Sequence, residues 1–161
     1  MSHSILTDIN LYNCAPSGQI AANEDMFNGD PSTDVLSMEN YDEIVFFITK
    51  NAGAVGTATI TVESCDDVTP TTSTAVAYNY VATTSGNTIS AVTAAAAAGF
   101  TTTAGADQSY AISIRADGLS GTNKYVRMVM TEVANAAVDG AVISLGAKAA
   151  YPQAQPREMI T

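Results

Sequence analysis

The side chains able to carry out chemistry are few in this chain. His3 is the sole histidine, and the only cysteines, Cys14 and Cys65, lie far apart and form no C-x-x-C pair. Ser-His-Asp and Cys-His catalytic centres need a histidine, and His3 falls in a segment that we expect to be an arm. Zinc and redox sites need closely spaced cysteines. We therefore expect no enzyme activity, no cofactor and no metal. We interpret both cysteines as buried free thiols, with a single disulfide as the alternative.

Two groups of acidic residues raise the question of calcium binding. Neither group has the D-x-[DN]-x-[DN]-G spacing of a calcium loop, so we interpret both as solvated loop acids. Carboxylates such as Glu43 and Glu63 also permit a glycosidase pair, but the chain has no Trp for a sugar platform. The two groups are Glu63, Asp66 and Asp67, and Glu24, Asp25 and Asp30.

The composition is that of a folded β-protein. Of 161 residues, 47% are hydrophobic and 14% are charged, and Thr, Ala, Ser and Gly fill the intervals between apolar runs. Such a chain is too apolar for disorder and too rich in Thr and Val for a helical bundle. Its length fits one domain with a substantial core.

Charge is distributed unevenly along the chain. The formal net charge is −10, and Lys50 is the only basic residue up to Asp67. Nucleic-acid binding needs clustered Lys and Arg, whereas Arg115, Lys124 and Arg127 are scattered, so we expect no nucleic-acid partner. The acidic half has two interpretations: a face kept soluble by charge, or a surface that docks on a basic protein.

The N-terminal sequence MSHSILTDINLY lacks the positive start and the apolar core of a secretion signal. No run approaches the roughly 18 apolar residues of a membrane span. We therefore expect a chain made and folded in a cytoplasm, with no membrane partner.

Period-2 alternation of apolar and polar residues is the strongest local signal. It occurs in TATITVE, SYAISIR, KYVRMVMTE and GAVISLGAKA, and AVAYNYVA and NTISAV are expected to be further strands. EIVFFITK is continuously apolar from Ile44 to Ile48, which is typical of a central strand covered on both faces. With turn signals between them, these segments predict an all-β protein, an antiparallel β-sandwich or jelly roll. The predicted core comprises Ile44, Phe46, Ile60, Val62, Ile112, Ile114, Met128 and Ile143.

Two connecting segments carry specific predictions. The stretch from Ser109 to Val133 has two alternating runs around Asp-Gly and Ser-Gly pairs, which predicts a β-hairpin with Arg115 and Lys124 facing each other. The Ala-rich segment 93–99 begins with a capping Thr and ends with Gly. It is predicted to form a short helix or a loop between two strands.

The two ends of the chain differ from the middle. We expect a single domain in which residues 1–37 hold an N-terminal arm and the first strands, 38–149 the sandwich core, and 150–161 an extended C-terminal tail. The arms carry apolar residues in polar surroundings with no obvious partner in the chain. The predicted contacts with a partner are Leu11, Tyr12, Phe27, Tyr151 and Pro152.

The segments YDEIVFFITK, TATITVESCDD, YAISIRADG and KYVRMVMTEV, followed by an extended tail, resemble small virion proteins of tailed bacteriophages. Among these the chain is most similar to head decoration, or cement, proteins. The resemblance implies a jelly-roll-like sandwich that self-associates as a dimer or trimer. It also implies binding to the major capsid protein on the capsid exterior, where the protein stabilises the shell without catalysis.

Two other functions remain open. A phage neck or tail structural protein would have the same sandwich core. A secreted ligand-binding β-sandwich module would need exposed aromatic residues or a metal site, together with an export signal.

Overall fold

The structure is a computed structural model that describes residues 10–13, 25–53 and 55–149. The described residues form eleven β-strands and one 3₁₀ turn, η2 (Ala116–Gly118). The strands are β1 (Asn10–Asn13), β2 (Leu36–Ser37), β3 (Tyr41–Lys50), β4 (Thr57–Cys65), β5 (Ser73–Val76), β6 (Tyr78–Thr83), β7 (Thr93–Ala95), β8 (Phe100–Thr101), β9 (Gln108–Arg115), β10 (Tyr125–Ala134) and β11 (Gly140–Ala149).

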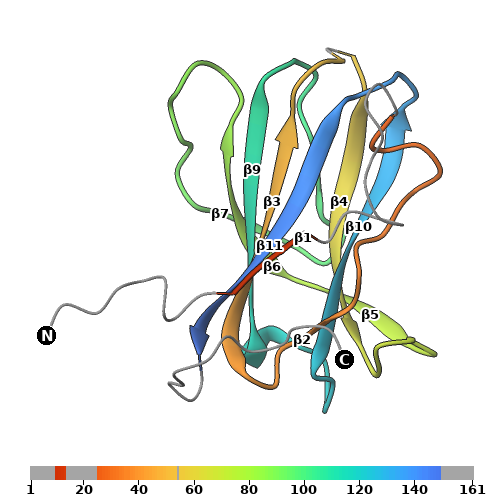
Figure 1. The fold of residues 1–161 in the computed structure, drawn as a ribbon, viewed down its shortest axis with the longest axis vertical. Coiled ribbons are helices and arrows are strands. Elements are labelled where there is room, and N and C mark those ends of the chain that lie inside the picture. Colours follow the sequence, from red (N-terminus) through yellow and green to blue (C-terminus); the bar gives the residue numbers. More distant parts are fainter. Residues whose placement is uncertain (1–9, 14–24, 54, 150–161) are drawn as a thin grey trace, which may run out of the picture.

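The strands form two antiparallel sheets packed face to face (Figure 1). The first sheet has six strands in the order β1-β11-β3-β9-β6-β7. The second has the order β2-β10-β4-β5, with β8 also paired to β4. The expected all-β antiparallel sandwich is therefore confirmed. β3 is a central strand, as its continuous apolar run predicts, because β11 and β9 pair with it on either side.

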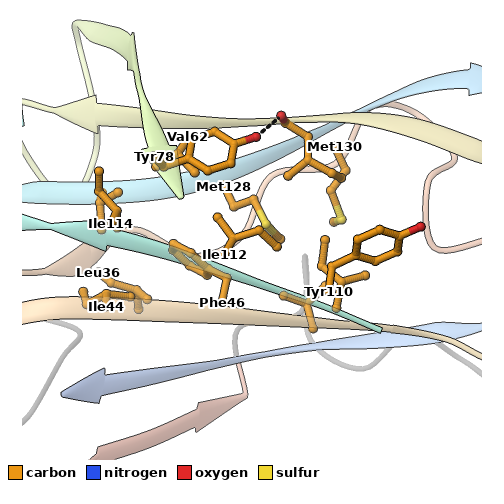
Figure 2. Packing of buried hydrophobic residues seen from close by; sticks show 14 of the residues in the cluster. Leu36, Ile44, Phe46, Val62, Tyr78, Tyr110, Ile112, Ile114, Met128 and Met130 are labelled. Atoms are coloured by element: carbon orange, nitrogen blue, oxygen red, sulfur yellow. Dashed lines mark hydrogen bonds between the residues drawn. The ribbon is translucent and has the colours of Figure 1, made fainter. Parts of the chain in front are cut away.

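The core fills the space between the inner faces of the two sheets (Figure 2). β3, β4, β9 and β10 each bury alternate residues there, which is the geometry that a period-2 pattern encodes. Tyr78 is also buried, and its hydroxyl donates a hydrogen bond to the Ile60 carbonyl (Figure 2). Seven predicted core residues are buried: Ile44, Phe46, Ile60, Val62, Ile112, Ile114 and Met128.

β11 presents the opposite face to the core from the one predicted. Val142 and Ser144 are fully buried, whereas Ile143 is 36% exposed on the outer side of the sheet. The prediction placed the larger apolar residues inside, but β3 also carries apolar residues on its outer side, where Ile143 lies directly opposite Phe47. Val45 and Phe47 are only partly buried, so β3 is covered less fully on its outer face than on its inner face, and not equally on both as its sequence suggests.

β9 and β10, which were expected to pair as a hairpin, lie in different sheets. β9 pairs with β3 and β6, whereas β10 pairs with β2 and β4. The hairpin prediction is wrong because the connection, residues 116–124, crosses from one sheet to the other. Arg115 lies 3.2 Å from Asp117, and Lys124 lies 2.7 Å from Glu39, so the two bases form separate ion pairs.

Residues 25–37, expected within the N-terminal arm and first strands, run alongside β10 (Figure 1). Backbone hydrogen bonds of 2.8 and 2.9 Å join Thr33 and Pro31 of this segment to β10. The segment places Phe27 and Leu36 in the core at 0% exposure. Phe27 is therefore occupied within its own chain, and its predicted contact with a partner is wrong. An irregular segment buries single side chains rather than a face, so its sequence shows no period.

The Ala-rich segment forms an edge strand, β7, and a turn, rather than a helix. A few Ala residues cannot sustain an isolated helix, whereas β7 gains backbone hydrogen bonds from β6. In the turn, Gly99 has a φ of 78°, and a Cβ there would lie 1.9 Å from the Ile60 carbonyl oxygen, so only glycine fits. Residues 87–92, predicted as a strand, lie in an irregular connection between β6 and β7.

Candidate functional site: an uncharged groove on the six-stranded sheet

The outer face of the six-stranded sheet carries a row of apolar side chains across four strands. Ile143 on β11 lies directly opposite Phe47 on β3. Phe47 lies opposite Ala111 on β9, which in turn lies opposite Val81 on β6. Directly opposite residues share a face in an antiparallel sheet. These four side chains therefore lie side by side, and we call them the outer row.

A groove of about 290 Å³ opens along the outer row. Its shape follows from residue size, because Ala111 and Ser109 on β9 are small while Phe47 and Val81 on the flanking strands are larger. Ile89, from the connection between β6 and β7, also lines the groove. No lining residue is charged. The groove can therefore accept an apolar group, but its lining offers no carboxylate, amine, imidazole or thiol for catalysis.

A long uncharged part of the chain contributes to this groove. No Asp, Glu, Lys, Arg or His occurs from Val68 to Ala106, a range that includes β6 and β7 of the six-stranded sheet and β5 and β8 of the second sheet. Within it, Ile89 and Val92 are 67% and 72% exposed. On a chain with a net charge of −10, an uncharged flank with exposed aliphatic side chains is a candidate for contact with another protein.

The outer face of the second sheet is more polar. β4 carries Thr57, Thr59, Thr61 and Glu63 on this side. Glu63 Oε2 accepts a hydrogen bond of 2.7 Å from Arg127 Nε on the neighbouring β10. The two side chains are 22% and 27% exposed, so the ion pair is partly shielded from water. This face is stabilised by cross-strand polar pairs.

Lys50, at the end of β3, is fully buried. Its Nζ donates to the carbonyl oxygens of Gly56 and Thr103 at 2.9 Å and to Gln108 Oε1 at 3.4 Å. Three acceptors match the three N–H donors of an ammonium group. Burial lowers the pKa of this amine. The arrangement joins β3 to two loops, and the fold occupies every donor of the side chain, so the geometry is that of a structural group rather than a nucleophile.

The first predicted acidic group, Glu63, Asp66 and Asp67, is divided between separate contacts. Glu63 forms the ion pair described above, whereas Asp66 accepts hydrogen bonds of 2.6 to 3.2 Å from backbone and hydroxyl groups of Thr71 and Thr72. These hydrogen bonds, led by that of the Thr71 hydroxyl, lower the pKa of Asp66 to about 2. The carboxylate therefore closes the loop between β4 and β5.

The second predicted acidic group joins the N-terminal segment to the sandwich. Asp25 accepts backbone N–H bonds at 3.1 and 3.2 Å, and Asp30 accepts one of 2.7 Å from the Glu132 N–H. Partial burial, and then the neighbouring Asp25 and Asp30 carboxylates, raise the pKa of Glu132. Glu24 lies outside the described residues. Over residues 10–13, 25–53 and 55–149, no group of three or more His, Cys, Asp or Glu side chains is placed to hold a metal ion.

Cys65 is a buried free thiol, as predicted, while Cys14 lies outside the described residues. Burial raises the pKa of the Cys65 thiol to about 11. The reactive form of cysteine is the thiolate, which is scarce at neutral pH when the pKa is this high. Cys65 is therefore a packing residue.

The predicted contact residues are not gathered at the groove. Leu11 and Tyr12 belong to β1, where they lie opposite Leu145 and Ser144 of β11. Tyr151 and Pro152 lie outside the described residues, as does His3.

The candidate site is built from residues that the sequence reasoning did not single out for contact, such as Phe47, Ala111 and Ile89. Alternating apolar residues were attributed to the core wherever they occurred. The signal that identifies this flank is the absence of charge from Val68 to Ala106.

Comparison of the chain with protein-family models, with curated proteins and with solved structures finds no match. Within the described ranges, no helix is long and apolar enough to cross a membrane.

Proposed function

We propose that this chain is a non-enzymatic structural protein of a bacteriophage virion. In this role it decorates the capsid exterior and stabilises the shell by binding the major capsid protein. The observation that carries the proposal is the division of its surface. One sheet has an apolar groove with no charged lining residue on its outer face, whereas the chain as a whole has a net charge of −10. A surface divided in this way suits a protein that acts by adhesion.

The contacts of the reactive side chains support a non-enzymatic role. Lys50 has its three donors occupied by the fold, and the pKa of Cys65 is raised to about 11. Glu63 and Asp66 are engaged in an ion pair and in a loop closure. Each of these groups performs a structural task, and none of them lines the groove.

The capsid contact is assigned to the two ends of the chain and to its acidic half. β1 is a short edge strand whose four residues pair with β11 alone. Leu11, Tyr12, Tyr151 and Pro152 remain the predicted contact residues. On a symmetric shell many copies bind together, so each contact needs to contribute only a little free energy.

Deletion tests this assignment. One variant lacks residues 1–12, which removes Leu11 and Tyr12, and a second lacks residues 150–161, which removes Tyr151 and Pro152. A Val133→Asp variant serves as the matched surface control, since Val133 is 59% exposed on the other sheet. We expect at least one deletion to reduce retention on purified particles and their survival on heating, and the control to do neither. Unchanged retention in both deletions would contradict the arm mechanism.

The position of the protein in the particle separates decoration from a neck or tail role. Cryo-microscopy of virions that contain this chain should place it on the outer surface of the head. Density at the neck or the tail would select the alternative structural role, and failure to find the protein on any virion would overturn the proposal.

A ligand-binding module is the second candidate, and the groove is the observation that favours it. A volume of about 290 Å³ lies at the lower limit for small-molecule sites. Native mass spectrometry distinguishes this candidate. A small apolar molecule retained by the purified protein and lost from an Ala111→Arg variant would support it, whereas a ligand-free protein favours the structural role.

A further inference from the structure

We infer that the outer row and its groove form the contact surface for a second copy of this chain, arranged as a two-fold symmetric dimer. The inference deepens the proposed function, because it assigns the surface through which copies associate. It concerns the isolated protein and does not require a capsid.

The first reason is that a knob and a hollow lie side by side on one face. Ile89 is 67% exposed at the rim of the groove, and Ala111 is the small residue over which the groove opens. A two-fold interface uses the same patch on both copies. The Ile89 side chain of each copy can therefore enter the hollow over Ala111 of the other, and both insertions occur at once.

The second reason is charge. Two copies that each carry −10 repel one another wherever their acidic surfaces meet. The groove lining and the stretch from Val68 to Ala106 bring no charge to the contact. A second copy can therefore dock on this flank without desolvating an unpaired ion, which is the costly event at protein interfaces.

The third reason is the edge of the sheet. β7 (Thr93–Ala95) is the outermost strand on this flank, and it carries no charged residue and no proline. Charged residues and proline are the usual means by which edge strands avoid pairing with other chains. β7 lies beside β6, which contributes Val81 to the outer row, so the flank as a whole is open to association.

The uncharged surface is better suited to a second copy of the chain than to a charged partner. A basic capsid patch would find its complement in the acidic half of the chain, where Lys50 is the only base up to Asp67. The uncharged flank offers such a patch no counter-charge. Self-association through the groove therefore does not depend on the acidic charges that would bind a basic capsid patch.

Sedimentation of the purified protein across a concentration series tests the inference. The wild-type chain should form a dimer. Ile89→Asp and Ala111→Lys should each weaken the dimer by about tenfold or more, since each places an unpaired charge in the contact. Both positions face outward and are at least partly exposed, so both variants should keep the wild-type circular dichroism spectrum. Val133→Asp, an aspartate on the other sheet, should dimerise like wild type.

Mixing the two variants is the most specific test of the contact. In a mixed dimer, the carboxylate introduced by Ile89→Asp in one copy would face the ammonium group introduced by Ala111→Lys in the other. The remaining knob and hollow in that dimer are native. The mixture should associate more tightly than either variant alone. A monomeric wild type, equal weakening by Val133→Asp, or no gain on mixing would each overturn the inference.

The same samples separate this inference from the proposed function. A protein that stays monomeric yet binds capsids would overturn the dimer and leave the capsid role standing. A dimer that is found on no virion would support the dimer contact and overturn the capsid role.

Discussion

The two outer faces of this sandwich differ although both lie on antiparallel sheets that share one core. The second sheet presents threonines and the Glu63–Arg127 ion pair, whose side chains are about a quarter exposed. The six-stranded sheet presents Phe47, Ala111 and Val81 around a groove without charge. The first pattern is that of a solvated face, whereas the second contains an apolar groove that no other described residue fills. This difference is the basis of our proposal that the groove on the six-stranded sheet mediates association.

The largest expected effect compares neighbouring residues on β9. Ile112 is fully buried, whereas Ala111 points outward into the groove. Ile112→Asp should prevent folding, because burying an unpaired carboxylate costs several kcal/mol, comparable to the whole stability of about 5–15 kcal/mol. Ala111→Asp should retain a cooperative thermal transition in circular dichroism. If both variants unfold, the outer face belongs to the core, and the comparison fails.

The next effect concerns Cys65, at the end of β4 in the second sheet. The pKa of this thiol is about 11 in the folded protein and 9.0 in its ordinary state. Between these values the unfolded chain binds fewer protons than the folded chain, so the stabilising effect of the protonated thiol is fully present below pH 9 and is lost as pH rises through 11. The free energy of unfolding should fall by roughly 2–3 kcal/mol over this pH range.

Denaturant titrations of wild type and Cys65→Ala from pH 8 to 11 measure this loss. The wild-type free energy of unfolding should fall more steeply with pH than that of the variant. Parallel curves would contradict the burial of the thiol. Dimerisation at neutral pH should be the same for both proteins, because Cys65 is buried in the second sheet.

A smaller effect is expected for the ion pair on the polar face. Arg127→Met should lower the free energy of unfolding by about 1 kcal/mol, as for a partly shielded pair. Arg115→Met is the matched control, since the Arg115 and Asp117 side chains are 62% and 73% exposed, and its effect should be smaller. Neither change should alter the sedimentation of the dimer. A dimer weakened by Arg127→Met would show that the polar face also mediates association.

The smallest effect concerns Asp66, in the exposed loop after β4. Hydrogen bonds from Thr71 and Thr72 hold its pKa at about 2, below the ordinary 3.8. Ionised Asp66 therefore stabilises the loop above pH 3.8, and this contribution disappears as pH falls through 2. Asp66→Asn should make the melting temperature depend less on pH between pH 2 and 4. Asp117→Asn, in another exposed loop, controls for loss of charge, and an identical profile for both variants would count against the loop closure.

The sequence predicts which residues of most strands face inward, but not which strands pair. Alternation fixes the face of a strand, whereas its partner depends on how a connection runs through space. The connection between β9 and β10 contains turn residues, yet it crosses between the sheets. AVAYNYVA likewise looks like one strand, but β5 ends at Val76 and β6 begins at Tyr78, in the other sheet.

The candidate site is not predicted from the sequence, because apolar residues in strands are assigned to the core by default. Ile143 was predicted in the core because it is the larger residue, while the structure buries Val142 and Ser144 on the same strand. Hydrophobicity identifies the inner face only when the outer face is polar. On β3 and β11 both faces carry apolar residues, so the error in β11 has the same physical origin as the outer row itself.

Hydroxyl-radical footprinting across a protein concentration series tests the central claim most directly, because it reports on both outer faces of the unmodified protein at once. The informative side chains are Phe47 and Ile89 on the six-stranded side, with Tyr125 and Val133 on the other. We expect labelling of Phe47 and Ile89 to fall as concentration rises, while labelling of Tyr125 and Val133 stays constant. Constant labelling on both faces, or protection confined to Tyr125 and Val133, would contradict it.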